Sequence, residues 1–214
     1  MQHTFLFLTT VFLGFFAMLN PIGNTPVFLS MVGDADSKVI KKIAFRAVFV
    51  AFSIIAIFCL FGHVIFKLFG ITLPAFQIAG GIIVFLIGYD LLQGKASGVH
   101  QSKMKRSVSS LEDMAISPLG IPLLAGPGTI SSAMNFVGEG ESFFVTLLII
   151  LVFAIVCGLT YLLFILSKNI SDRLSPSLIK VVSRIMGLIL TVIAVQMFIN
   201  GVFKVIKEFP GLFS

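Results

Sequence analysis

The sequence predicts an all-α integral membrane protein in which six transmembrane helices form two inverted-topology three-helix repeats, with helices 1 and 4 broken near the membrane interior. The prediction rests on composition, on the lengths of the apolar runs and on a duplicated proline and glycine pattern. Of 214 residues, 57% are hydrophobic and 11% charged, against about 45–50% and about 25% in a soluble domain. A mean hydropathy of +1.10 leaves no room for a soluble domain and excludes a soluble enzyme.

Six apolar runs are each long enough to cross a bilayer, which takes about 20 helical residues. They cover residues 4–31, 40–66, 73–92, 115–137, 143–166 and 178–205. These runs are too long for the strands of a transmembrane barrel and lack their strict alternation. No Lys or Arg precedes the first run, and no small-residue cleavage site is found, so we expect a retained helix and not a signal peptide.

Basic residues lie mainly on one side of these spans. Only Lys67, Lys204 and Lys207 lie on the other side. The remaining twelve are Lys38, Lys41, Lys42, Arg46, Lys95, Lys103, Lys105, Arg106, Lys168, Arg173, Lys180 and Arg184. Since Lys and Arg near span ends stay cytoplasmic, we expect both termini to face away from the cytoplasm. Loop positions thus explain the net charge of +6, and no nucleic-acid partner is expected.

Residues in the first half of the sequence recur in the second half at a constant offset. Gly187 follows Gly81 by 106 residues, Gln196 follows Asp90 by the same number, and Pro127 follows Pro21 by 106 again. Two three-span halves have opposite topologies, which is the arrangement of an inverted repeat. The sequence therefore divides into a first repeat (1–94), a cytoplasmic linker (95–112) and a second, inverted repeat (113–214).

Prolines and glycines interrupt the first and fourth spans. The predicted break residues are Pro21, Pro26, Pro118, Pro122 and Pro127. A proline removes one amide donor and clashes with the carbonyl four residues back. Unpaired backbone groups cost several kcal/mol in hydrocarbon, so a break persists only where protein or a polar cavity surrounds it. We expect the two breaks to face each other inside the bilayer.

The breaks predict a binding site for a compact zwitterion. Half-helices that begin near Asn24 and Gly128 would present free amides and a partial positive charge to a carboxylate. Carbonyls that end the preceding half-helices suit an ammonium group or a small cation. The predicted binding residues are Asn20, Gly23, Asn24, Thr25, Gly126, Gly128, Thr129 and Ser131. The alternative is that these residues only kink packed helices.

Other chemistry is sparse. Asp90 is the only acid within an apolar run, and Arg184 begins the sixth span on the same side. A membrane carboxylate suggests function, so Asp90 and Arg184 are the candidates for coupling to H⁺ or Na⁺, although Asp90 near the interface can also be solvated or paired. Sodium could instead use backbone carbonyls. Enzyme motifs such as H-E-x-x-H or a phosphate loop are absent, so we expect no enzyme, no cofactor and no metal site.

Three motifs in order resemble the MarC family of six-span bacterial membrane proteins. They are Asn20-Pro21-Ile22-Gly23-Asn24-Thr25-Pro26; Pro118-Leu119 with Pro122 and Ala125-Gly126-Pro127-Gly128-Thr129-Ile130; and Arg184-Ile185-Met186-Gly187 with Gln196 and Gly201. The resemblance covers nearly the whole chain apart from the linker. Gly120 departs from the alanine that we expect there, which puts the shape of that break in doubt.

The resemblance implies a multi-pass protein of the bacterial inner membrane that transports small neutral amino acids, namely glycine, alanine, serine or threonine. It implies a secondary exporter or exchanger in which rocking between the two halves exposes the site alternately. Efflux of drugs or other small metabolites, a passive channel and a non-transporting subunit of a membrane complex are the alternatives. The sequence does not decide between a monomer and a homo-oligomer.

Overall fold

The computed structural model describes residues 2–32, 35–93, 124–140, 142–171 and 176–208. Over these ranges the chain is helical and contains no strand. The helices are α1 (Gln2–Leu19), α2 (Pro21–Val32), α3 (Ser37–Phe69), α4 (Leu73–Leu92), α6 (Pro127–Glu139), α7 (Phe143–Ser171) and α8 (Pro176–Glu208). The predicted linker, Pro118 and Pro122 lie outside the described residues. The all-α prediction is confirmed for the part of the chain that is described.

Five helical segments are long and apolar enough to cross a membrane. They are Thr4–Leu29, Ser37–Phe69, Leu73–Leu92, Phe143–Ser167 and Gly187–Lys207. They match the first, second, third, fifth and sixth predicted spans. The fourth predicted span begins outside the described residues, and its described part is the 13-residue helix α6.

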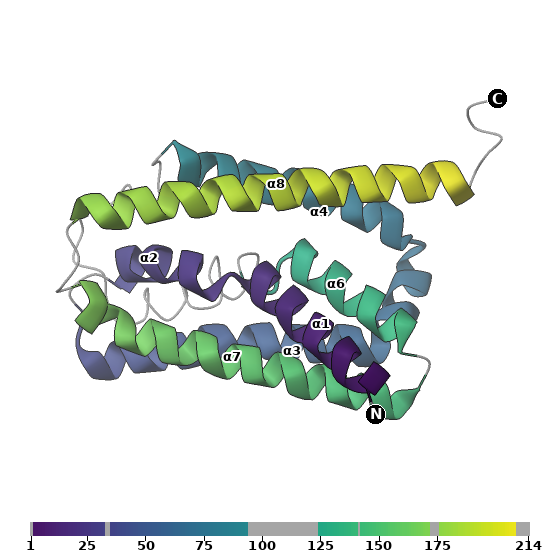
Figure 1. Cartoon of the computed structure of the whole chain (residues 1–214), viewed down its shortest axis with the longest axis horizontal. Helices are drawn as coiled ribbons and strands as arrows, with labels where there is room; N and C mark the ends of the chain where they lie inside the picture. The colour runs from purple at the N-terminus through teal and green to yellow at the C-terminus, as the bar shows by residue number, and fades with distance from the viewer. Residues whose placement is uncertain (1, 33–34, 94–123, 141, 172–175, 209–214) are drawn as a thin grey trace.

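The helices form three layers (Figure 1). Helices α4 and α8 pack side by side in one outer layer, and α3 and α7 pack together in the other. The short helices α2 and α6 lie between them: α2 contacts α7 and α8, while α6 contacts α3 and α4. The chain breaks that precede α2 and α6 therefore fall in the interior of the bundle.

Large apolar side chains occupy both the core and the outer surface. Phe15, Phe28, Phe153 and Phe164 are fully buried, and the rings of Phe28 and Phe164 stack at 4.3 Å between centroids. Many others are exposed on the long helices, including Phe45 and Val192. A contiguous apolar exterior is unfavourable in water but suits contact with lipid chains. The packing thus agrees with a membrane-embedded protein.

Glycines bring the backbones of α4 and α8 into direct contact. A Cβ on Gly88 would lie 2.8 Å from the Thr191 amide nitrogen and 2.9 Å from the Gly187 carbonyl oxygen. A Cβ on Gly81 would similarly lie 2.8 Å from the Ala194 carbonyl oxygen. Backbone atoms cannot move aside as side chains do, so only glycine fits at these crossings. Small residues at helix contacts are the usual means of close packing in membranes.

We expect Gly88→Ala to destabilise the fold by about 1–3 kcal/mol, because the added methyl group collides with the α8 backbone. The control is Gly158→Ala in α7, where an added Cβ meets nothing within 4 Å. Thermal unfolding of the purified proteins in detergent measures the difference. Equal stabilities of the two variants would contradict the backbone contact.

Candidate functional site

The first interruption is the single residue Asn20 between α1 and α2. Its φ of 43° lies in the left-handed region, which asparagine tolerates better than most residues. Its Oδ1 accepts the N–H of Gly23 at 3.2 Å, so Asn20 caps the first turn of α2. Pro21 is the first residue of α2, where its missing N–H removes no helical bond.

Two predicted details of this break are corrected. The second half-helix begins at Pro21 rather than near Asn24, and it continues through Pro26 rather than breaking there. The reason is that the left-handed conformation of Asn20 alone produces the change in direction of the chain. An interior proline removes a single helical hydrogen bond, and neighbouring helices can tolerate that loss in a membrane bundle.

The second interruption lies at Gly126, immediately before α6. Gly126 is extended, and its carbonyl accepts the N–H of Ile130 at 3.0 Å. Pro127 again is the first helical residue. Because Gly126 carries no side chain, it makes no side-chain cap hydrogen bond to the first turn of α6. Within the described residues, this turn therefore lacks the cap that Asn20 gives to α2.

At each break, a polar side chain donates a hydrogen bond to a backbone carbonyl. The Asn24 Nδ2 atom donates to the Leu19 carbonyl at 2.7 Å, and the Thr129 Oγ1 atom donates to the Leu124 carbonyl at 3.0 Å. In both cases the donor lies five residues after the acceptor. A buried carbonyl without a partner costs about 1–3 kcal/mol, so these polar side chains stabilise the breaks. The hydroxyl of Thr25 likewise donates to the Pro21 carbonyl at 2.8 Å.

The two breaks approach each other through Met18. A Cβ on Gly128 would lie 3.3 Å from the sulfur of Met18 and 3.2 Å from that of Met197. Met18 is two residues before Asn20, and Gly128 is two residues after Gly126. The end of α1 and the start of α6 thus meet beside α8, as expected for two breaks that face each other.

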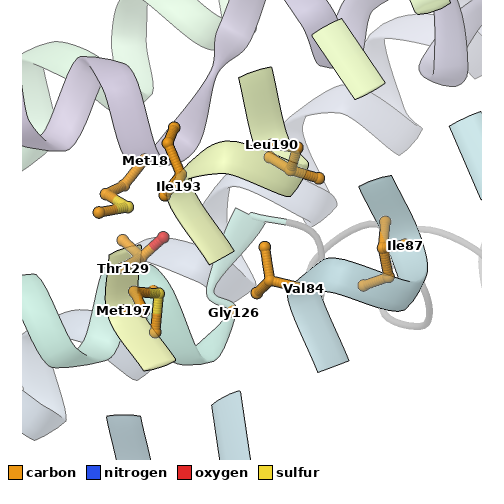
Figure 2. A pocket seen from close by; sticks show the side chains of 9 residues that line it. Met18, Val84, Ile87, Gly126, Thr129, Leu190, Ile193 and Met197 are labelled. Atoms are coloured by element: carbon orange, nitrogen blue, oxygen red, sulfur yellow. The ribbon is translucent and has the colours of Figure 1, made fainter. Parts of the chain in front are cut away.

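A cavity of about 20 Å³ lies at this meeting point. Figure 2 shows Thr129 between Met18 and Met197, with aliphatic side chains of α4 and α8 nearby. This central cavity is lined by Met18, Val84, Ile87, Gly126, Gly128, Thr129, Leu190, Ile193 and Met197. A cavity needs roughly 10–15 Å³ for one water molecule, so this one has room for about one water. An amino acid enters only if the lining side chains move apart.

The predicted site residues separate into two groups. Gly126, Gly128 and Thr129 line the central cavity, whereas Asn20, Gly23, Asn24 and Thr25 do not. These four residues instead form the first break and its hydrogen bonds. Ser131 lies one turn further along α6, where its Oγ accepts the Nε2 of Gln77 at 2.9 Å.

Sequence reasoning missed the apolar lining. Met18, Met197 and the aliphatic residues carry no polar signature, so they read as ordinary core. The repeat offset was nevertheless a usable signal, because Leu190 follows Val84 by 106 residues and Ile193 follows Ile87 by the same number. Both pairs line the cavity.

A second, larger cavity opens at one end of the bundle. This end cavity has a volume of about 810 Å³ and is lined by Phe58, Cys59, Leu60, His63, Phe66, Lys67, Ile71, Thr72, Leu73, Pro74, Met134, Val137 and Gly138. The two coupling candidates lie elsewhere. Asp90 is half-buried near the end of α4 and Arg184 is exposed on α8, and no ion pair joins these two described residues.

We expect Thr129→Val to destabilise the protein by about 1–3 kcal/mol, because the Leu124 carbonyl loses its donor. The control is Thr160→Val, since the Thr160 hydroxyl donates to the Val156 carbonyl within the regular helix α7. That carbonyl keeps its place in the helical ladder. Thermal unfolding in detergent should show a larger loss for Thr129→Val, and equal losses would contradict the role of Thr129 at the break.

Comparison with known proteins gives the same assignment throughout the chain. The model of the MarC family of integral membrane proteins matches residues 5–206. UPF0056 membrane protein YvbG of Bacillus subtilis is 40% identical over 210 residues, covering 95% of this chain and 99% of the relative. UPF0056 membrane protein YhcE of Escherichia coli is 34% identical, covering 95% and 94%. No solved structure matches. The chain therefore belongs to the MarC family of integral membrane proteins.

Proposed function

We propose that this protein is a secondary transporter of small neutral amino acids that works by alternating access. The observation that carries the proposal is the uncapped first turn of α6, which opens onto the central cavity beside the other break. Helix N-termini bind anions through free amides and the helix dipole. A substrate carboxylate would take that position, as the sequence predicted for Gly126, Gly128 and Thr129.

The size of the central cavity supports a small substrate. With about 20 Å³ of space, it represents a closed state that must widen even for glycine. Met18 and Met197 are flexible, unbranched side chains that can repack, so a modest movement makes room for a few atoms. A bulky drug would require the helices to separate, which makes drug efflux the weaker proposal.

An inverted repeat, with halves at 1–94 and 113–214, is the architecture that we propose for this mechanism. Helix contacts support it. The contact of α2 with α7 has its counterpart in that of α6 with α3, and the contact of α2 with α8 in that of α6 with α4. Likewise, the approach of Gly81 to Ala194 maps by the 106-residue offset onto that of Gly187 to Gly88. Such repeats are frequent in secondary transporters.

The proposed orientation places the end cavity on the extracytoplasmic side of the bacterial inner membrane. In Figure 1, α1 begins and α8 ends at the same end of the bundle, and α3 begins at the opposite end. The exposed side chains of Lys38, Lys41 and Lys42 begin α3, so the positive-inside rule assigns that end to the cytoplasm. We keep H⁺ and Na⁺ as alternative coupling ions, with Asp90 and Arg184 as the side-chain candidates.

Transport in proteoliposomes tests the proposal. Wild-type protein should exchange labelled glycine, alanine, serine or threonine by counterflow, and imposed H⁺ and Na⁺ gradients should identify the coupling ion. We expect Gly128→Val to reduce exchange at least about tenfold, the equivalent of roughly 1.4 kcal/mol of lost binding. The valine side chain would lie against the sulfur atoms of Met18 and Met197 and fill the central cavity.

Gly158→Val is the matched control, because Gly158 is exposed and a Cβ there meets nothing within 4 Å. Both variants should remain monodisperse in detergent. Undiminished counterflow by Gly128→Val would remove the central cavity from the transport route. Absence of amino-acid counterflow by the wild type, with movement of cationic drugs instead, would favour efflux.

We also propose a homo-oligomer that associates through α8. Gln196 and Asn200 are exposed near the middle of the segment Gly187–Lys207, and Gln196 Nε2 donates to Asn200 Oδ1 at 2.9 Å. Exposed amides are costly in hydrocarbon. A second copy could satisfy them, because each amide both donates and accepts.

Replacement of both residues by leucine should therefore shift the protein to a smaller species in cross-linking and light scattering. The double variant keeps the apolar surface that a lipid-facing helix needs. An unchanged oligomeric state would contradict the proposed interface.

A further inference from the structure

Gln77 on α4 holds a buried polar atom without a partner. The residue is 4% exposed, and its Nε2 donates to the Ser131 hydroxyl on α6 at 2.9 Å. Its other polar atom, Oε1, is buried and has no hydrogen-bond partner among the described residues. Buried side-chain oxygens are nearly always paired, so an orphan acceptor at the contact of two interior helices requires an explanation.

The Gln77–Ser131 pair lies between the two cavities. Helices α4 and α6 pack together, and a Cβ on Gly80 would collide with Pro127. Three residues from the pair in one direction along each helix, Pro74 and Met134 line the end cavity. In the other direction, Gly128 and Val84 line the central cavity. A solute that passes from one cavity to the other along α4 and α6 thus passes Gln77.

One carbonyl at each break already accepts a side-chain hydrogen bond, that of Leu19 from Asn24 and that of Leu124 from Thr129. An ammonium group has three N–H donors, so a further acceptor near the α6 N-terminus would strengthen its binding. Gln77 Oε1 is the buried side-chain atom that lacks a donor in the described residues.

We propose that Gln77 Oε1 accepts an N–H from the α-ammonium group of the transported amino acid while the first-turn amides of α6 hold its carboxylate. This inference rests on the proposed transport function and specifies which protein groups bind the ammonium and the carboxylate of the substrate. Gly128 and Ser131 are three residues apart, a rise of about 4.5 Å along α6. That spacing suits a substrate whose two charged groups share one carbon atom. Ser131 is a positioning residue, because it holds the Gln77 amide by its nitrogen.

Ligand binding by purified protein in detergent tests the assignment. Dissociation constants for L-alanine and for propionate, which has the carboxylate but no amine, follow from thermal stabilisation as a function of ligand concentration. We expect Gln77→Leu to weaken alanine binding about 10- to 100-fold, the usual effect of losing a hydrogen bond to a charged group. Propionate binding should stay unchanged.

Gln93→Leu is the matched control, because it makes the same substitution at an exposed position just after α4. Ser131→Ala should weaken alanine binding less than Gln77→Leu does and should also spare propionate. If Gln77→Leu does not fold, Gln77→Asn, which retracts the carbonyl by one methylene, is judged by the same criteria.

The remaining outcomes separate the two proposals. Wild-type-like alanine binding by the Gln77 variant, or an equal loss for alanine and propionate, would overturn the role of Gln77 and leave the transporter proposal intact. A wild-type protein that binds and exchanges no amino acid would overturn both.

Discussion

The whole structure depends on the need to satisfy backbone polar groups where a helix stops inside an apolar bundle. A membrane offers no water to the carbonyls and amides that a break exposes. This protein covers them with its own side chains, Asn24 at the first break and Thr129 at the second. The breaks also lie between the two outer helix pairs, α4 with α8 and α3 with α7. The exception is the first turn of α6, which has no N-cap side chain among the described residues and lines the central cavity.

That exception distinguishes the two breaks, although both place a proline at the helix start. Asn20 caps α2 with its own side chain, whereas Gly126 at the matching position has none to offer. In the function that we propose, the first break is closed by its own side chain and the second break receives the substrate. The lining from Met18, Met197 and their aliphatic neighbours leaves room for only about one water beside the second break. In such surroundings a few main-chain dipoles act more strongly than they would in water.

Much of this could be predicted from the sequence, for reasons that are local. Long apolar runs determine helices, and the prolines and glycines after Leu19 indicate the first break. The contacts between distant segments were less accessible. Pro26 stays within a helix because Asn20 already turns the chain, a fact that no single residue reveals. The unpaired oxygen of Gln77 becomes apparent only in the structure, where Ser131 on another helix accepts the hydrogen bond of its nitrogen. The linker and the prolines at 118 and 122 lie outside the described residues and stay predictions.

The close backbone contact of α4 with α8 has a mechanical consequence. These helices come from different halves of the chain, yet the main chains of Gly88 and Gly187 leave no room for a methyl group between them. Sliding or separating α4 and α8 would break this close contact, so we expect the two helices to move together. A hinge between the α4–α8 pair and the remaining helices would preserve this contact, whereas rocking of one half of the chain against the other would break it. In the alternating-access mechanism that we propose, each moving body would then contain helices from both halves of the chain.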